Sequence, residues 1–315
     1  MRTFVVTGGA GFIGSNTVQR LVRRGDKVRV IDNLVAGYES NLDSVRDDIE
    51  FINADINDSS ALASAFEGVD CVFHQAALAS VPLSLEQPLR VNQACISGTL
   101  NVLDQARRSG VRRVVYSSSS VYGDQPFAAN RETDIPMTNS PYAAAKLAGE
   151  FYCQAFANSY GIETVSLRYF NVFGPRQDPN SQYSAVIPRF ITRILEGKQP
   201  IVFGDGKQTR DFTYVDNVVD ANLLACDAEN ISGQVFNIAD GRTTSLLELL
   251  LQLSDAMGTP VKPDFQDARQ GDTPSSTADI SAAQQRLGYA PNTDFKTGLL
   301  KSIDYYKSMM LQETA

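Results

Sequence analysis

The chain has 315 residues, of which 43% are hydrophobic and 20% charged, and a formal net charge of −8. This length suits one large α/β domain or two smaller ones, and the acidic balance argues against a broad basic surface for nucleic acid. One histidine and four scattered cysteines argue against a zinc site, and no apolar run reaches the roughly 20 residues that span a bilayer. The first residues run into a strand rather than a signal peptide. We therefore expect a reduced, cytoplasmic protein without metal, membrane or nucleic-acid partners.

The first 170 residues alternate short β-branched runs with helical stretches. Strands are predicted at residues 3–8, 27–33, 49–55, 70–77, 112–118 and 163–171. The stretches between them show helical periodicity, and most end at a glycine; they are 12–25, 59–68, 89–110 and 142–161. Strand and helix in alternation predict an α/β fold with a doubly wound parallel sheet.

Beyond Gly174 the pattern is less regular and rich in loop-forming residues. Helices are predicted near 189–198 and 245–258, a strand followed by a helix within 210–229, and further strands near 200–206 and 233–241. We expect residues 1–170, with about 212–240, to form one domain. Residues of about 171–211 and 241–315 are expected to form a smaller, interleaved α/β lobe.

A glycine-rich stretch, VVTGGAGFIGSN, joins the first strand to the first helix. Its glycine spacing allows a tight turn, close approach of a pyrophosphate, and close contact of helix and strand, and the free N–H groups of the helix start favour the anion. Asp32 ends the second strand, where it can accept hydrogen bonds from both ribose hydroxyls, which favours NAD over NADP. The pattern predicts a Rossmann-type dinucleotide site formed by Gly8, Gly11, Phe12, Ile13, Gly14, Asp32 and Asn33.

Two further positions concern this predicted site. Asp55 and Ile56 close the third strand, where they can hold and pack the adenine, although Asp55 also suits a plain turn. His74 lies within the fourth predicted strand. We interpret it as a packing residue of the core or beside the cofactor, and not as a catalytic group.

The segment SPYAAAK, residues 140–146, places Tyr142 and Lys146 one helical turn apart. Ser140 can cap the helix, Pro141 suits its first turn and the alanines favour helix. Such a pair alone is common on protein surfaces. The run SSSSVYG, residues 117–123, however, ends a predicted strand at the edge where a doubly wound sheet binds its ligand. We therefore expect the nucleotide, the serine hydroxyls and the Tyr–Lys pair to lie close together at this edge.

Together, TGGAGFIG, SSSSVYG and YAAAK resemble the extended short-chain dehydrogenase/reductase family, and within it the NAD-dependent nucleotide-sugar 4-epimerases, from residue 3 to about 295. The resemblance implies that Tyr142 is the acid/base and that Lys146 lowers its pKa and holds the nicotinamide ribose. A free phenol titrates near pH 10, so positive charge from Lys146 and the oxidised ring is expected to stabilise the phenolate. Ser118 matches the hydroxyl that binds the sugar O4, with Ser119 as the alternative register, and Ser120 matches a second sugar contact.

The same resemblance implies the remaining contacts. Cofactor contacts are expected from Gln75, Ala76, Ala77 and Asn92. Substrate contacts are expected from Asn171 at the sugar and diphosphate, from Arg210 and Arg269 at the diphosphate, and from Asp272 at the uridine ribose. Helices 88–109 and 141–160 resemble the family's dimer-forming four-helix bundle, which implies a homodimer.

Two positions concern the sugar. Ser276 stands where epimerases restricted to glucose and galactose carry a bulky tyrosine, and Ala79 where galactose-type enzymes often carry lysine. Both departures favour the N-acetylhexosamine branch, with UDP-GlcNAc and UDP-GalNAc as the first expected pair and UDP-Glc and UDP-Gal as the second.

Several alternatives stay open. A UDP-glucuronate 4-epimerase needs only local donors for the extra carboxylate. A 4,6-dehydratase needs an Asp-Glu pair where this chain has Ser119 and Ser120, and the decarboxylases typically carry a glutamate at the position of Ser120. A non-catalytic dinucleotide sensor usually loses the tyrosine or the lysine, both of which this chain retains.

Overall fold

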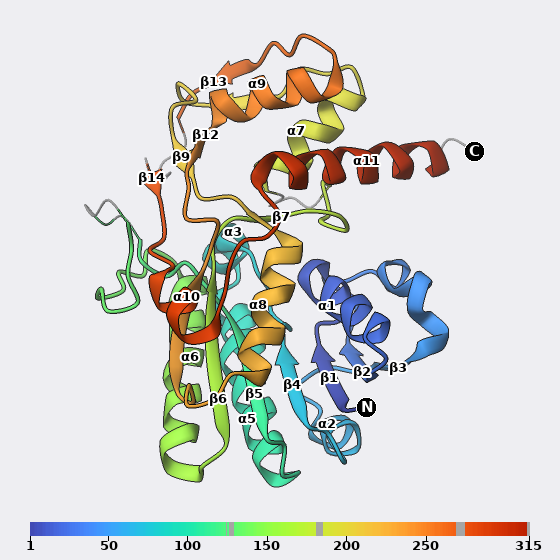
Figure 1. Ribbon diagram of the computed structural model, residues 1–315, viewed down its shortest axis with the longest axis vertical. Coiled ribbons are helices and arrows are strands. Elements are labelled where there is room, and N and C mark those ends of the chain that lie inside the picture. The colour runs from blue at the N-terminus through green and yellow to red at the C-terminus, as the bar shows by residue number, and fades with distance from the viewer. Residues whose placement is uncertain (124, 126–128, 181–184, 269–274, 314–315) are drawn as a thin grey trace.

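A seven-stranded parallel sheet forms the centre of the computed structural model (Figure 1), which describes residues 1–123, 125, 129–180, 185–268 and 275–313. The strand order is β3-β2-β1-β4-β5-β6-β11. The chain moves outward from β1 on one side and restarts beside it with β4, so the order reverses between these two strands. The bounds are β1 (Thr3–Thr7), β2 (Lys27–Asp32), β3 (Ile49–Asn53), β4 (Cys71–His74), β5 (Arg113–Ser119), β6 (Glu163–Tyr169) and β11 (Gln234–Ile238). The predicted doubly wound α/β fold is confirmed.

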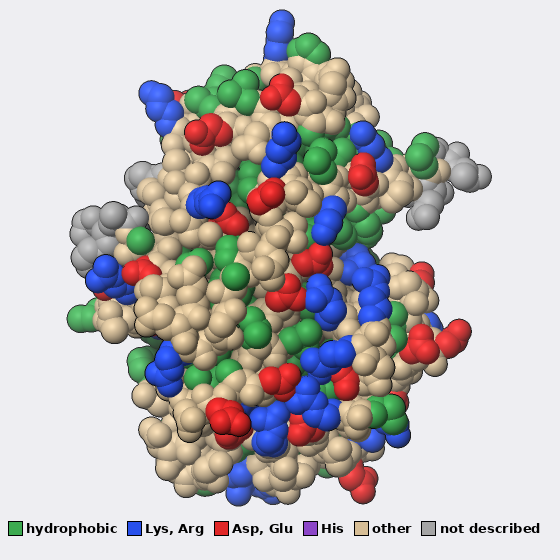
Figure 2. All heavy atoms as spheres, viewed as in Figure 1, with side chains coloured by type: hydrophobic (Ala, Val, Ile, Leu, Met, Phe, Trp, Pro, Cys, Tyr) green, Lys and Arg blue, Asp and Glu red, His purple; other side chains and the backbone are tan. Residues whose placement is uncertain are grey.

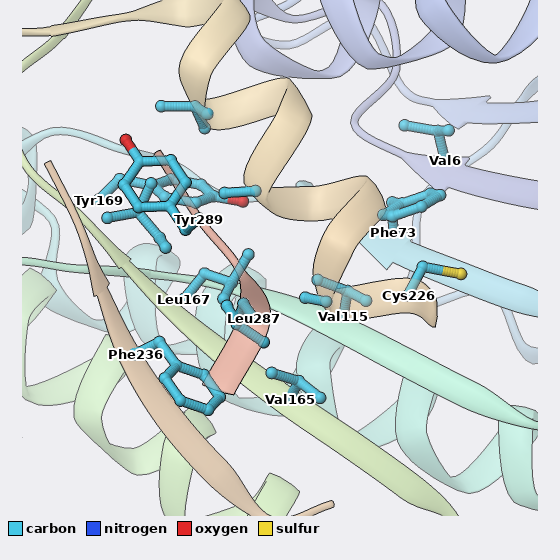
Figure 3. Packing of buried hydrophobic residues seen from close by; sticks show 14 of the residues in the cluster. Val6, Phe73, Val115, Val165, Leu167, Tyr169, Cys226, Phe236, Leu287 and Tyr289 are labelled. Carbon is cyan, nitrogen blue, oxygen red and sulfur yellow. The ribbon is translucent and has the colours of Figure 1, made fainter. Parts of the chain in front are cut away.

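Helices cover both faces of this sheet because its strands carry apolar side chains on both. On β5, Val115 belongs to the core cluster that includes residues of α1, α8 and α10, whereas Val114 and Tyr116 belong to the cluster with residues of α2, α5 and α6. Figure 3 shows the first of these cores, where Phe73 and Leu167 lie among side chains from several strands and helices. The helices are α1 (Phe12–Arg23), α2 (Ser59–Ala65), α5 (Gly98–Arg108), α6 (Pro141–Tyr160), α8 (Val215–Asp227) and α10 (Ser281–Leu287).

The helix predicted at 89–110 is divided into three segments. It consists of α4 (Pro88–Asn92), a π-helical segment η2 (Gln93–Ser97) and α5. Single π turns inside α-helices are rare and frequently mark functional sites. The sequence analysis also missed α3 (Val81–Glu86) and a 3₁₀ segment, η1 (Glu39–Asp48).

A smaller lobe lies above the carboxyl ends of the strands (Figure 1). Its core joins Phe173 to apolar residues of α7, α9 and α11. The helices are α7 (Val186–Leu195), α9 (Leu246–Met257) and α11 (Phe295–Glu313). The short strands are β7 (Val172–Phe173) with β10 (Thr213–Tyr214), β8 (Ile201–Phe203) with β13 (Asp264–Gln266), and β9 (Thr209–Arg210) between β12 (Thr244–Ser245) and β14 (Ser275–Ser276).

The division between sheet and lobe differs from the predicted one at α10. The sequence analysis assigned residues 241–315 to the lobe, but Ala283, Leu287 and Tyr289 are buried in the core against β11 and α8. The amphipathic α10 therefore covers the last strand of the sheet, and the chain returns to the lobe only with α11.

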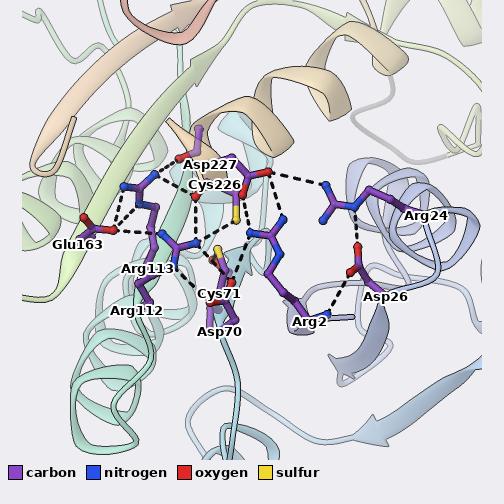
Figure 4. Close-up of polar contacts among 12 residues, drawn as sticks. Arg2, Arg24, Asp26, Asp70, Cys71, Arg112, Arg113, Glu163, Cys226 and Asp227 are labelled. Carbon is purple, nitrogen blue, oxygen red and sulfur yellow. Dashed lines mark hydrogen bonds and ion pairs between the residues drawn. The ribbon is translucent and has the colours of Figure 1, made fainter. Parts of the chain in front are cut away.

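A network of ion pairs lies at the amino ends of the strands, opposite the lobe (Figure 4). Arg2 lies 2.5 Å from Asp227 at the end of α8, and the buried Arg113 lies 2.8 Å from Glu163 of β6. Figure 2 shows acidic and basic side chains interspersed over the visible face of the molecule. Among the described residues no helix is long and apolar enough to cross a membrane, and no cluster of His, Cys, Asp or Glu could hold a metal ion.

Candidate active site

A cavity of about 940 Å³ opens at the carboxyl ends of the strands. Residues that follow or end β1, β2, β3, β4, β5 and β6 all line it, so it lies where the strand order reverses, the usual ligand crevice of such sheets. The predicted residues that it brings together are Gly8, Gly11, Phe12, Ile13, Gly14, Asp32, Asn33, Asp55, Ile56, Gln75, Ala76, Ala77, Ser118, Tyr142 and Lys146.

The glycine-rich turn leaves room for a ligand at one of its glycines. Gly8 has a φ of +69°, and a Cβ there would lie 2.6 Å from the backbone nitrogen of Ala76. A Cβ on Gly14 would collide with the carbonyl oxygen of Gly8. Gly11, by contrast, has an ordinary φ of −76° and meets only Gly8 O, at 3.2 Å. A Cβ on Gly11 would therefore be tight against Gly8 O without a strained backbone, and it would enter the space of the cavity that Gly11 lines.

Helix α1 begins at this turn, and within the described part of the chain no side chain caps its amino end. Gly11 is the N-cap and supplies no side-chain hydrogen bond, and the first turn holds no acidic residue. The first backbone N–H groups and the helix dipole are thus available to an anion. This is the arrangement that a dinucleotide pyrophosphate requires.

Asp32 stands at the far end of the cavity with its carboxylate buried. Its two oxygens accept hydrogen bonds from Ala10 N at 2.9 Å and Leu34 N at 2.8 Å, and burial raises its pKa. Each oxygen has a second lone pair. A ribose diol can donate to these lone pairs, whereas a 2′-phosphate would meet a buried negative charge.

A contact between two strand ends lies along the same cavity. Asn33 Nδ2 donates to Asp55 Oδ2 at 2.7 Å, across the loops that follow β2 and β3. Although burial opposes it, hydrogen bonds from Asn57 and Asn33 lower the pKa of Asp55. With the open helix end and the Asp32 carboxylate, these groups fit NAD.

Tyr142 and Lys146 lie on the first two turns of α6. Ser140 caps this helix by accepting from Ala143 N at 3.2 Å, and Pro141 occupies its first turn. Lys146 Nζ lies 6.0 Å from the centroid of the Tyr142 ring and donates to Ser117 O at 2.8 Å. The backbone carbonyl at the end of β5 therefore fixes the ammonium group beneath the phenol.

The titration of this pair differs from the expectation that Lys146 lowers the Tyr142 pKa. Burial raises the pKa of Tyr142, opposed by a hydrogen bond with Ser119, and burial lowers the pKa of Lys146. Removing a phenolate from water outweighs the distant ammonium. Burial therefore disfavours the phenolate of Tyr142 in the chain without cofactor, and a further positive charge in the cavity would favour it.

The serine run at the end of β5 divides its hydroxyls among different partners. Ser117 Oγ donates to His74 O at 2.9 Å, and Ser118 Oγ donates to the buried carboxylate of Glu150. The Ser119 side chain makes the hydrogen bond with Tyr142. The alternative register, Ser119, is thus the hydroxyl in contact with the phenol, while Ser120 is partly buried.

Glu150 itself forms a buried ion pair. Arg168 of β6 donates to its two carboxylate oxygens at 2.9 and 2.7 Å, and both side chains are 4% exposed. The sequence analysis missed this pair because nothing in the pattern distinguishes a helix glutamate that is buried from one on the surface.

A second cavity, of about 460 Å³, lies in the lobe and shares Ala185 with the first. Asn171 and Arg210 line it, as predicted for the substrate side, and Arg189 and Arg193 of α7 also line it. Ser276 pairs with Arg210 in the register of β14 and β9 and is partly buried. Arg269 and Asp272 lie outside the described residues.

The structure places some residues differently from the sequence analysis. Asn92 is exposed on α4, and the neighbouring Gln93 and Ala94 of the π segment line the first cavity. Tyr169 also lines it and donates through its hydroxyl to Asn222 at 2.8 Å. Its position at the carboxyl end of β6 was a signal that could have identified it.

Two loops meet at the mouth of the first cavity. Tyr38, after β2, donates through its hydroxyl to Asp178 Oδ2 at 2.7 Å, and both residues line the cavity. The sequence analysis missed this contact because the two residues lie in separate irregular segments.

Residues 4–239 match the NAD dependent epimerase/dehydratase family. The chain belongs to this family. The UDP-glucose 4-epimerase of Mycolicibacterium smegmatis is 39% identical over 98% of this chain and 99% of that protein. The structure of UDP-N-acetylglucosamine 4-epimerase from Methanobrevibacter ruminantium is 40% identical, with a TM-score of 0.94 over 98% of this chain and 99% of that one. UDP-glucuronic acid 4-epimerase from Bacillus cereus, solved with UDP-glucuronic acid and NAD, is 32% identical, with a TM-score of 0.90 and the same coverage.

Proposed function

We propose that this family member is an NAD-dependent UDP-sugar 4-epimerase that interconverts UDP-GlcNAc and UDP-GalNAc, with UDP-Glc and UDP-Gal as a second pair. The proposal rests chiefly on one arrangement: the phenol of Tyr142, in contact with a serine hydroxyl, stands where a dinucleotide cavity adjoins a cavity lined by arginines. Relatives that act on UDP-sugars share this architecture over nearly the whole chain.

The chain's own residues supply the proton transfer. When bound, NAD supplies a nicotinamide ring that accepts a hydride from C4 of the sugar and later returns it. Tyr142 takes the O4 proton as a 4-keto sugar forms and gives it back after the sugar has turned over. Lys146, anchored to Ser117 O, holds the nicotinamide ribose and keeps positive charge near the phenol. Ser118 or Ser119 binds O4.

The second cavity supports a nucleoside diphosphate beside the sugar. Arg189, Arg193 and Arg210 concentrate positive charge there in a chain whose net charge is −8. Guanidinium groups suit forked contacts to phosphate oxygens. Phe203 and Phe212 add aromatic surface to the walls for a base. Asn171, with the predicted Arg269 and Asp272, completes the proposed diphosphate and ribose contacts.

The preference for an N-acetylated sugar rests on Ser276. This small side chain lies in register with Arg210, which lines the cavity that we assign to the diphosphate. A serine leaves volume for an acetamido group that a tyrosine would fill. UDP-glucuronate is the alternative, since the related B. cereus enzyme is named for that substrate.

A substrate comparison tests the proposal. The purified protein is incubated separately with UDP-GlcNAc, UDP-Glc and UDP-glucuronate, without added NAD, and products are resolved by proton NMR. We expect UDP-GalNAc from UDP-GlcNAc as the fastest reaction. Conversion of UDP-Glc alone would contradict the role of Ser276. Conversion of UDP-glucuronate alone would establish the alternative substrate.

We also propose a homodimer. Phe151 on α6 is 61% exposed, and Leu85 and Leu89 on α3 and α4 are 64% and 84% exposed. The three helices are neighbours, because both α3 and α4 contact α6. Apolar side chains gathered on adjoining helices suit burial against a second copy of the chain.

A further inference from the structure

His74, the single histidine of the chain, bridges two walls of the cofactor cavity. It is buried at the carboxyl end of β4, with its Nδ1 2.7 Å from Thr7 Oγ1 and its Nε2 2.9 Å from Thr99 Oγ1. Thr7 ends β1, immediately before the glycine-rich turn. Thr99 lies in the first turn of α5, just after the π-helical segment. The imidazole therefore links these two elements through its two nitrogens.

The hydrogen-bond donors can be assigned by following the chain of contacts. Thr99 Oγ1 lies 2.6 Å from Cys95 O, which can only accept, so the Thr99 hydroxyl donates there. Its oxygen is left to accept from His74, which places the histidine proton on Nε2. At Nδ1 a neutral ring has a lone pair, and the Thr7 hydroxyl donates to it. Thr7 Oγ1 in turn accepts from Ala76 N, at 3.4 Å.

The surroundings favour this neutral form. Burial, together with the charge of Lys146, lowers the pKa of His74 to about 3. The Tyr116 ring, whose centroid lies 5.6 Å from that of the imidazole, adds no formal charge at neutral pH. A second ring proton would point at the Thr7 hydroxyl, which would then have to turn away from Nδ1.

Both linked elements reach the cofactor cavity. The turn after Thr7 contains Gly8 and Gly11, and the π segment carries Gln93 and Ala94, all of which line the cavity. The Thr99 hydroxyl bonds the Cys95 carbonyl inside that segment. The contacts of His74 thus extend from the pyrophosphate side of the cavity to its π-helical wall.

We propose that His74, as the neutral Nε2–H tautomer, is a positioning residue that holds the glycine-rich turn and the π segment at the separation NAD requires. It acts through Thr7 and Thr99 and takes no part in proton transfer with substrate. This inference deepens the proposed function only in its NAD-binding half, so it can be tested without any UDP-sugar.

Nitrogen-15 NMR tests the tautomer directly, because the only imidazole signals come from His74. The expected spectrum shows a protonated Nε2 and an unprotonated Nδ1, unchanged between pH 8 and pH 5. A protonated Nδ1, or a titration midpoint near the ordinary value of about 6.5, would overturn the assignment. Neither reading depends on catalysis.

A matched pair of substitutions tests the positioning role. Thr99→Val removes the acceptor for Nε2–H at nearly constant volume, and Thr99→Ser retains it. By titration calorimetry on nucleotide-free protein, we expect Thr99→Val to raise the Kd of NAD about tenfold, as for a buried group that loses its partner. Thr99→Ser is expected to bind within about threefold of the unsubstituted protein, since its hydroxyl is kept.

Thermal unfolding of the nucleotide-free variants separates positioning from folding. A folded Thr99→Val protein with unchanged NAD affinity would overturn the proposal. If Thr99→Val does not fold, Thr7→Val and Thr7→Ser make the same comparison at the other nitrogen. Equal NAD affinity in that pair would overturn it as well. An inactive epimerase assay combined with the expected NAD affinities would contradict only the substrate half of the proposed function.

Discussion

Burial in the cavity favours the neutral form of Tyr142. The phenol lines the cavity, and loss of water around it raises its pKa, against a single opposing hydrogen bond from Ser119. Lys146 cannot reverse this because its ammonium lies 6.0 Å from the ring centroid and is itself buried. Tyr142 must lose its own proton before it can accept one from a substrate. We expect an additional positive charge in the cavity to favour that loss. The positive charge of an oxidised nicotinamide ring would favour the phenolate, whereas the anionic diphosphate of a UDP-sugar would not.

Tyr142→Phe is expected to retain NAD but lose epimerisation. General acid–base groups typically contribute about 10²–10⁴-fold, so we expect at least a 100-fold fall in kcat with little change in the Kd of NAD. NMR assays and calorimetry measure the two quantities. Tyr169→Phe is the matched control, since it removes another hydroxyl from the cavity lining and should lower kcat far less. Similar losses in both variants would contradict the assignment.

The two central serines are expected to respond differently to alanine. Ser118 donates to the buried Glu150, so Ser118→Ala is expected to lower the free energy of unfolding by ~1–2 kcal/mol. Ser119→Ala removes the hydroxyl beside Tyr142 and is expected to slow epimerisation with a smaller effect on stability. Denaturant unfolding and the NMR assay compare them. A greater loss of rate in Ser118→Ala would favour the register implied by the family resemblance.

At the scale of elements, the glycine-rich turn separates backbone requirements from ligand requirements. Gly8 needs its positive φ, and Gly14 needs its missing Cβ because Gly8 O occupies that space. Gly11 has neither requirement. We infer that a glycine at this position leaves room beside the helix end, where the pyrophosphate is expected.

Alanine at Gly11 should therefore affect NAD binding, whereas alanine at Gly14 should affect stability. Gly11→Ala is expected to fold normally and to bind NAD more weakly, because the new methyl group enters the cavity. Gly14→Ala is expected to lower the free energy of unfolding by ~1–3 kcal/mol, the usual cost of overpacking. Calorimetry and thermal unfolding distinguish the two. A destabilised Gly11→Ala protein with intact NAD binding would contradict this interpretation.

The same scale shows what the sequence could predict. The strands of the sheet and the glycine turn were predictable because alternation, β-branched runs and glycine spacing are local signals. The π segment was not, since Gln93–Ser97 has the composition of an ordinary helix and no local signal distinguishes it from one. The partners of the serine hydroxyls could not be predicted either, because the side-chain rotamer decides whether Ser118 bonds Glu150.

At the scale of the whole molecule, the two cavities divide the chemistry between sheet and lobe. Residues at the carboxyl ends of the strands line the first cavity together with Tyr142 of α6, and the lobe contributes the arginines that line the second, where we propose a diphosphate. The chain crosses between them more than once, since α10 returns to β11 before α11 completes the lobe. A cytoplasmic location stays a prediction.

The proposed dimer can be tested at one side chain. Phe151→Asp places a charge within the proposed interface on α6 and is expected to give a monomer by size-exclusion chromatography with light scattering, at unchanged thermal stability of the monomer. Leu251→Asp is the control, because Leu251 is similarly exposed, at 66%, but lies on α9. A dimer that persists in Phe151→Asp would place the interface elsewhere.

The fate of the C4 hydrogen tests the central claim most directly. UDP-GlcNAc carrying deuterium at C4 is incubated with the purified protein in ordinary water, and the product is examined by NMR and mass spectrometry. Reversible hydride transfer predicts UDP-GalNAc that retains the deuterium at C4, because the hydride returns to the carbon it left. A 4-epimer that has lost the label to solvent, or no 4-epimer from any UDP-sugar while NAD is bound, would contradict the account.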